Sequence, residues 1–346
     1  MKYLEKTSKL TRDYFSILSP EYPEWLNEYI ETVRMQKQQY ISVTCGKIYS
    51  KLFKYEEDFS SLDHSIAVAL IIWNFTHDKK QTLSGLFHDI ATPAFKHCID
   101  FLNGDYMNQE STEELTKFLI KNSNDIMKLL ERDNIKLEEV CDYHIYPIAD
   151  NDTPMLSADR LEYSLSNDLI VFKTNILEEI REIYNDIEIQ INENGINELG
   201  FKTKKIARQF VKNTSRLSIC YRDDKTRFFM QAIADILKKV SEDGLIQKKD
   251  LYELKESEVI DIIKKSKYKN IYNCLVNATK VNISKEEPKD MYYVNHGAKV
   301  RYIDPLFNGK RISKECKIAQ KMIDKNLSYD MEKYIFINKE FNMLKS

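Results

Sequence analysis

The chain has 346 residues, enough to bury a hydrophobic core in one large domain or in two coupled ones. Its 52 lysine and arginine residues nearly balance 54 aspartate and glutamate residues, which argues against a broad basic surface for nucleic acid or membranes. Only 8 glycines and 7 prolines accompany many leucine, isoleucine, lysine and glutamate residues, so we expect a mostly α fold and not a sandwich or barrel.

The six cysteines are dispersed, with no paired spacing. This pattern indicates reduced thiols and argues against a disulfide framework or a structural zinc site. The first residues lack the apolar segment of a signal peptide, and the most hydrophobic stretch, residues 66–75, is too short to span a bilayer. We therefore expect a cytoplasmic protein with no membrane partner and no strong nucleic-acid signal.

The first part of the chain predicts a helical bundle. Apolar residues recur at helical spacing over residues 24–55, and residues 65–75 are apolar nearly all round, as in a helix at the centre of a bundle. This central helix begins at His64. A second apolar run, residues 83–90, ends at His88-Asp89, before a helix break.

Helical patterns continue beyond this break. Residues 110–130 and 135–142 predict amphipathic helices, and the polar loop 150–154 leads into another helix over residues 155–172. Asp159 lies early in that last helix.

The pattern then changes to alternation. Isoleucines alternate with polar residues from residue 186, and Asn194-Gly195 supplies a turn, which predicts a short β-hairpin. Helical spacing resumes over residues 204–240, and Asp243-Gly244 marks a boundary. We therefore predict a helical core over residues 1–242 and a small C-terminal α+β lobe over residues 243–346. Within this lobe we expect a helix and two strands, at the following places: residues 256–265 for the helix, and 292–294 and 300–303 for the strands.

Two histidines and two aspartates stand at the edges of these apolar helices: His64, His88, Asp89 and Asp159. Each histidine taken alone is more simply a core or capping residue. Together they supply the nitrogen and oxygen ligands that a water-activating metal needs, if their helices pack side by side. The conjunction favours the metal site, because an unpaired polar group at an apolar helix edge is costly.

The ordered H…HD…D pattern resembles the HD-domain phosphohydrolase superfamily. The block HDIATPAFKHCID, from His88 to Asp100, is similar to the HD-x-x-x-x-P/x-F-x-H-x-x-D block of the deoxynucleoside triphosphate triphosphohydrolases. Residues 63–68 and 159–163 resemble their E-H-S-x-x-V and D-K/R-x-D/E-Y helices. The resemblance covers roughly residues 55–170 and implies an HD-domain helical bundle with its metal site in this region.

The resemblance also implies an enzyme that hydrolyses phosphate esters with a metal-activated water. The implied ligands of the divalent ion, whether Mn, Mg, Fe, Co, Ni or Zn, are His64, His88, Asp89 and Asp159. His97 would face the phosphates, with Asp100 beside it as an orienting carboxylate.

Further residues of the motif carry implied substrate contacts. Arg160 would meet phosphate oxygens, a role that suits its planar guanidinium. Tyr163 would pack against the sugar, and Asn167 stands where the family often has an aspartate that bonds a sugar hydroxyl. Tyr143-His144 would add to a pocket or a second metal, although a structural role is favoured for this pair.

Three departures from the triphosphohydrolase pattern bear on the substrate. Ser61 replaces an arginine, Thr92 replaces a pocket histidine, and Asn108-Gln109 stands where the catalytic His-Glu pair is expected. Asparagine cannot donate a catalytic proton. Either His97 and Glu110 take over acid and base work, or the leaving group differs, or the pair lies elsewhere. We expect Thr92 and Asn108 to contact the substrate.

The expected function is hydrolysis of a nucleotide or another small phosphate ester, with a deoxynucleoside triphosphate as the first candidate. The alternatives within the superfamily are a nucleotide phosphodiesterase, a 5'-nucleotidase, and a protein that senses nucleotides without turnover. The resemblance further implies a homo-oligomer.

Overall fold

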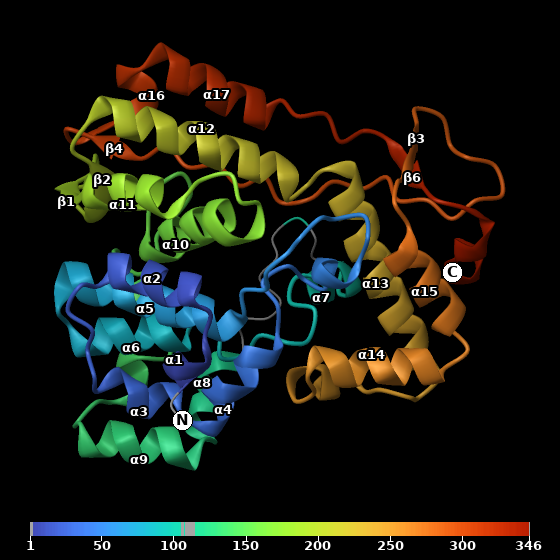
Figure 1. The fold of residues 1–346 in the computed structure, drawn as a ribbon, viewed down its shortest axis with the longest axis horizontal. Helices are drawn as coiled ribbons and strands as arrows, with labels where there is room; N and C mark the ends of the chain where they lie inside the picture. Colours follow the sequence, from blue (N-terminus) through green and yellow to red (C-terminus); the bar gives the residue numbers. More distant parts are fainter. Residues whose placement is uncertain (1–2, 105–106, 108–114, 346) are drawn as a thin grey trace.

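The computed structural model describes residues 3–104, 107 and 115–345. Helices dominate, and the strands form two small sheets, so the predicted mostly α fold with small β parts is confirmed (Figure 1). None of the helices in these residues is both long and apolar enough to cross a membrane.

In the described residues up to Arg132, the named secondary structure elements are all helices. The α-helices are, in chain order, α1 (Tyr3–Lys6), α2 (Lys9–Leu18), α3 (Leu26–Ile30), α4 (Val33–Lys37), α5 (Ser61–Thr76), α6 (Lys79–Phe87), α7 (Cys98–Leu102), α8 (Thr116–Lys121) and α9 (Asn124–Arg132). The helix predicted over residues 135–142 is only a 3-10 turn at Leu137–Glu139.

The second part mixes helices with short strands. Its elements are α10 (Ala158–Ser166), α11 (Leu177–Asn185), β1 (Ile187–Ile191), β2 (Asn197–Phe201), α12 (Lys204–Cys220), α13 (Asp224–Glu242), α14 (Glu256–Lys265), α15 (Lys269–Asn277), β3 (Asn282–Ser284), β4 (Leu306–Phe307), β5 (Lys310–Arg311), α16 (Ile312–Glu315), α17 (Lys317–Leu327) and β6 (Tyr334–Phe336).

Helix α5 is the central helix of the bundle. Its first turn is fixed by a capping box, in which Ser60 Oγ accepts the amide of Asp63 and the Asp63 carboxylate accepts the amide of Ser60. Its side chains are buried on every face up to Ile72, and α6, α10 and α2 pack around it. Because His64 lies in this first turn, the cap sets where its imidazole points.

Close packing of α5 against α6 depends on Gly85. A Cβ atom at this position would lie 2.2 Å from Ile72 Cδ1, so no larger residue fits without a shift. The contact brings His64, at the start of α5, beside His88, which caps the end of α6.

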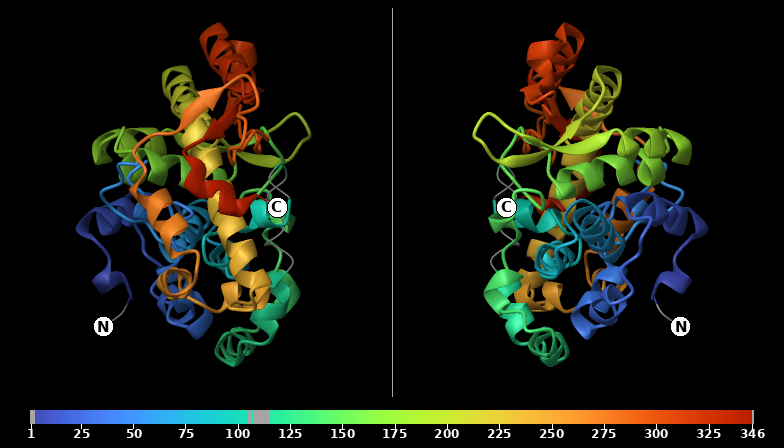
Figure 2. Two further views of the ribbon diagram at one scale, coloured as in Figure 1. Left: turned by 90° about the vertical axis from the view of Figure 1, so that its right-hand side faces the viewer. Right: turned by 90° about the vertical axis from the view of Figure 1, so that its left-hand side faces the viewer.

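The predicted hairpin is present as β1 and β2, which pair antiparallel with Ile187 opposite Phe201. Gly195 takes the left-handed conformation that its turn requires, with φ +76°. Figure 2 shows the hairpin reaching outward at one side of the molecule. The long helical pattern over residues 204–240 is interrupted, because Asp223 caps a new helix and separates α12 from α13.

The C-terminal segment adds to both sides of the molecule. Strand β4 joins the hairpin by parallel pairing with β2, and α17 lies along α12 (Figure 1). The segment then returns to place β6 beside β3 and α13. The predicted helix over residues 256–265 is confirmed as α14. The two predicted strands are wrong: residues 300–303 form none, and Val294 makes only a single bridge to Ile335.

Two hydrophobic cores result. One centres on α5 and includes Ile303 and Ile323, whereas the other centres on α13 and includes Phe95 and Ile335. Each core draws on residues from both sides of position 242. The division of the chain into two domains at that position stays a prediction.

Candidate metal centre

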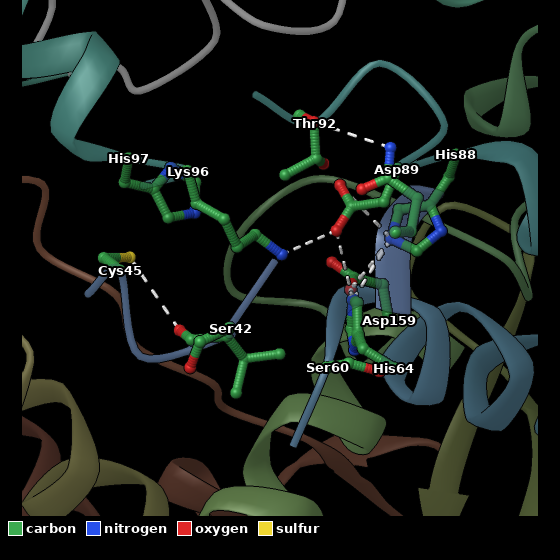
Figure 3. Close-up of polar contacts among 12 residues, drawn as sticks. Ser42, Cys45, Ser60, His64, His88, Asp89, Thr92, Lys96, His97 and Asp159 are labelled. Atoms are coloured by element: carbon green, nitrogen blue, oxygen red, sulfur yellow. Dashed lines mark hydrogen bonds and ion pairs between the residues drawn. The ribbon is translucent and has the colours of Figure 1, made fainter. Parts of the chain in front are cut away.

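Three helices bring His64, His88, Asp89 and Asp159 to one point (Figure 3). His64 Nε2 lies 3.2 Å from His88 Nε2, 3.1 Å from Asp159 Oδ1 and 3.9 Å from Asp89 Oδ2. His88 Nε2 lies 3.8 Å from Asp89 Oδ1 and 3.7 Å from Asp159 Oδ1. One ligand atom from each of His64, His88 and Asp89 lies within 4.8 Å of the others, so this group can hold a metal ion.

The rear nitrogens of both imidazoles are held by acceptors. His88 Nδ1 lies 2.7 Å from the Gly85 carbonyl, which can only accept, so Nδ1 is the donor and Nε2 is the atom that faces the other candidate ligands. His64 Nδ1 bonds the carboxylate of Glu162, a fully buried residue that also accepts from the Tyr14 hydroxyl. Such partners are typical of histidines that ligate metals, because they fix the ring and its tautomer.

The centre therefore attracts positive charge. Burial by itself would lower the pKa of His64, but Glu162 and Asp159 outweigh burial and raise this pKa to about 10. Burial would raise the pKa of Asp159, yet its bond to His64 holds that pKa well below its usual range. Two facing imidazole nitrogens and two carboxylates are a donor set that fits a divalent metal ion.

A lysine completes the charge arrangement. Lys96 Nζ lies 2.7 Å from Asp89 Oδ2, and both side chains are largely buried. Burial would raise the pKa of Asp89, but Lys96 and then the two imidazoles hold it well below its usual range. Lys96 and Phe95 both have positive φ, +42° and +66°, a strained conformation for residues other than glycine. The strained backbone of this loop thus places the ammonium group of Lys96 beside the candidate ligands.

The centre opens into a cavity of about 790 Å³. Of the residues predicted for the site, eight line this cavity: His64, His88, Asp89, His97, Asp159, Arg160, Tyr163 and Asn167. The size suits a small organic ligand.

No known protein-family model matches the sequence. An uncharacterized protein of Bacillus subtilis, YdhJ, is 23% identical over 274 residues, which cover 75% of this chain and 78% of that protein. Among solved structures, a hypothetical protein from Aquifex aeolicus superposes with a TM-score of 0.62 at 14% identity, covering 93% of this chain and 94% of the other. A phosphohydrolase from Bacteroides thetaiotaomicron superposes with a TM-score of 0.61 at 13% identity, covering 91% and 96%. The fold is shared with these two proteins. At 14% and 13% identity, the structural similarity shows a common fold and nothing about function.

Two of the predicted residues that line the cavity are held by hydrogen bonds to other parts of the protein. His97 Nδ1 lies 2.8 Å from the carboxylate of Asp100, which is fully buried behind it, so Asp100 orients the ring toward the cavity. Arg160 bonds Asn151 and the Met155 carbonyl in the loop before α10.

The other predicted contacts are placed as follows. Asn167 donates to the Tyr163 carbonyl. Thr92 is buried and lies outside the cavity wall, with its amide bonded to the Asp89 carbonyl. Asn108 and Glu110 lie outside the described residues. The roles predicted for all these residues in binding and catalysis stay predictions.

Three features of the site are not predicted from the sequence. Glu162 follows Asp159 by one helical turn, and this spacing is a signal that it shares the ligand face. Lys96 lies within the HD block, at a position to which the motif assigns no role. His144, for which the sequence favours a structural role over a place in a pocket, lines the cavity with Nδ1 2.9 Å from Asp150 Oδ2. Lys47, which also lines the cavity, belongs to no motif.

A buried glutamate of α14 positions two loops of the site. Glu256 Oε1 accepts the amides of Phe95, at 3.2 Å, and of Ser42, at 3.3 Å. Burial, with a smaller contribution from the charge of Asp58, raises the pKa of Glu256 to about 8. The folded protein therefore keeps this proton over a range in which the unfolded chain releases it.

This raised pKa predicts a pH dependence of stability. Between the ordinary glutamate pKa of 4.5 and about 8, the folded state binds more protons, so the free energy of unfolding should fall as the pH rises. Glu256→Gln removes the titrating group and should flatten the curve in this window. Urea unfolding at pH 5, 6.5 and 8 measures the effect, with the exposed Glu253→Gln as a control. Parallel curves for wild type and Glu256→Gln would show that the carboxyl does not titrate as inferred.

Proposed function

We propose that the chain is a metal-dependent phosphohydrolase that acts on a nucleotide or a similar small phosphate ester. The observation that carries the proposal is the convergence of His64, His88, Asp89 and Asp159 on the wall of a large cavity. The shared fold with a phosphohydrolase supports it, as does the motif resemblance. When bound, a divalent ion would supply a water of lowered pKa and neutralise charge on the phosphoryl oxygens.

The chain's own residues would do the remaining work. His97, held by Asp100 at Nδ1, presents Nε2 to the cavity, where it can exchange a proton with the leaving group. Lys96 carries a positive charge beside the candidate ligands, where phosphoryl oxygens would sit.

The aromatic wall of the cavity supports a nucleotide as the ligand. Phe172 lies edge-on to Tyr55, with ring centroids 5.8 Å apart, and tilted to Tyr221, with centroids 6.5 Å apart, and all three residues line the cavity. Such rings suit a flat nucleobase. Within this class we propose a deoxynucleoside triphosphate as the first candidate.

The experiment is metal analysis of the purified protein combined with a substrate screen. Nucleoside tri- and monophosphates and cyclic nucleotides are incubated with Mn, Mg, Fe or Co, and the products are separated. Release of tripolyphosphate supports the triphosphohydrolase, whereas orthophosphate or opening of a cyclic diester supports a nucleotidase or phosphodiesterase. Tight binding without product over hours would overturn hydrolysis and support a sensor.

A further inference from the structure

Lys47 is a buried lysine that the proposed chemistry does not use. It begins a 3-10 turn, Lys47–Tyr49, directly after Gly46, and is only 7% exposed, yet it lines the cavity. Gly46 has φ +78°, and a Cβ there would lie 2.6 Å from the Phe95 ring. The turn is therefore packed tightly against the loop that carries Lys96, which fixes the position of Lys47.

Lys47 has no counter-ion in the described part of the chain. Its amine forms no hydrogen bond or ion pair there, whereas Lys96 is paired with Asp89. The nearby ring of Phe53 has its centroid 5.6 Å from Nζ. Asp223, which acts on Lys47 only through its longer-range charge, is already engaged as the N-cap of α13. A buried ammonium without a partner is costly, so this amine is suited to an anion that enters through the cavity.

The surroundings of Lys47 are those of a binding site. Tyr55 is stacked on Phe53, with ring centroids 5.6 Å apart, and continues the aromatic wall toward Phe172 and Tyr221. The Tyr221 hydroxyl is buried and has no hydrogen-bond partner among the described residues. Lys47 and Tyr221 thus line one cavity beside aromatic rings, and each has a polar group without a hydrogen-bond partner among the described residues.

The neighbours of Lys47 differ from those of the metal centre. Figure 3 shows the Lys96 side chain between Cys45 on one side and His64, Asp89 and Asp159 on the other. Lys47 follows Cys45 by two residues and interacts electrostatically with it. The groups that act most strongly on Lys47 by their charge are Tyr55, Cys45, Asp223 and Cys98, and none of them is a candidate metal ligand. An anion at Lys47 would therefore have neighbours other than those of the metal centre.

We propose that Lys47 forms a second oxyanion subsite, which binds a negatively charged group of the ligand other than the phosphoryl group held at the metal centre. The inference rests on the proposed function for the statement that this ligand is a substrate. The preferred ligand then carries at least two separated oxyanions.

The test measures binding of tripolyphosphate by calorimetry in the full chain with its candidate metal ligands intact and a divalent ion present, and an assay for released orthophosphate checks that no turnover occurs during the titration. Lys47→Met should weaken binding about ten-fold or more, as expected for the loss of a charge-assisted hydrogen bond. Lys51→Met, at an exposed lysine of the same segment, should leave it unchanged. Orthophosphate, with one oxyanion, should lose less affinity than tripolyphosphate on Lys47→Met.

A second measurement separates binding from a structural role. Without added anion, Lys47→Met should keep or raise the melting temperature, because it removes an unpaired buried charge. Unchanged tripolyphosphate affinity, an equal loss for orthophosphate, or a lower melting temperature would each overturn the subsite. If the substrate screen finds no hydrolysis, these titrations still report on Lys47, so the two proposals fail separately.

Discussion

Replacing Asp89 with alanine is expected to abolish both the metal content and the hydrolytic activity of the purified protein. Asp89 is the one carboxylate in the group of three residues whose ligand atoms lie within 4.8 Å of one another. Removal of an outer partner of a metal ligand typically lowers affinity or activity by ~10 to 100-fold. Loss of a ligand itself should exceed this, so kcat/KM should fall by more than about 100-fold on every phosphorylated substrate.

The alanine variant also leaves Lys96 without its ion-pair partner, so it can unfold for reasons unrelated to metal binding. Asp89→Asn keeps the shape and a hydrogen-bond acceptor, and it should lose metal and activity while remaining folded. Asp261→Asn, on the exposed face of α14, is the matched control and should retain both. Stoichiometric metal and normal turnover in folded Asp89→Asn would reject the metal centre.

The sequence predicts those parts of the site that depend on neighbours along the chain, and it fails for those that depend on tertiary contacts. The sequence predicts the four candidate ligands because each one stands at the edge of an apolar helix, which a local pattern is enough to reveal. These are His64, His88, Asp89 and Asp159. The sequence could not show that Gly85 lets α5 and α6 approach closely. It also could not show that Glu162 reaches back to His64, because these contacts depend on tertiary packing.

The same limit explains the errors in the fold. The hairpin was found because β1 and β2 are adjacent and alternate in polarity. The pairing of Gly200 with Leu306 joins strands more than a hundred residues apart, and two-residue strands carry no periodicity. Lys47 was missed for a related reason, since a lysine in a loop reads as solvated until the cavity around it is known.

The largest expected effect on stability belongs to Arg311 of β5. Its guanidinium binds the carboxylate of Glu198 at two points, 2.6 and 2.8 Å, and also bonds Glu193. Glu198 is fully buried and accepts the amide of Leu156 as well, at 3.0 Å. This network ties the C-terminal segment to the loop that leads into α10, the helix carrying Asp159.

Arg311→Met should therefore lower the free energy of unfolding by about 3–5 kcal/mol, because it leaves the Glu198 carboxylate buried without a counter-ion. Urea denaturation measures the loss, with the exposed Lys310→Met as a control that should change little. Adding Glu198→Met to Arg311→Met should recover part of the stability, since the second change removes the stranded charge. A loss below about 1 kcal/mol for Arg311→Met, or a further loss in the double variant, would contradict this account. The recovered double variant should still bind metal more weakly than wild type, because the Leu156 amide next to the start of α10 has lost its carboxylate acceptor.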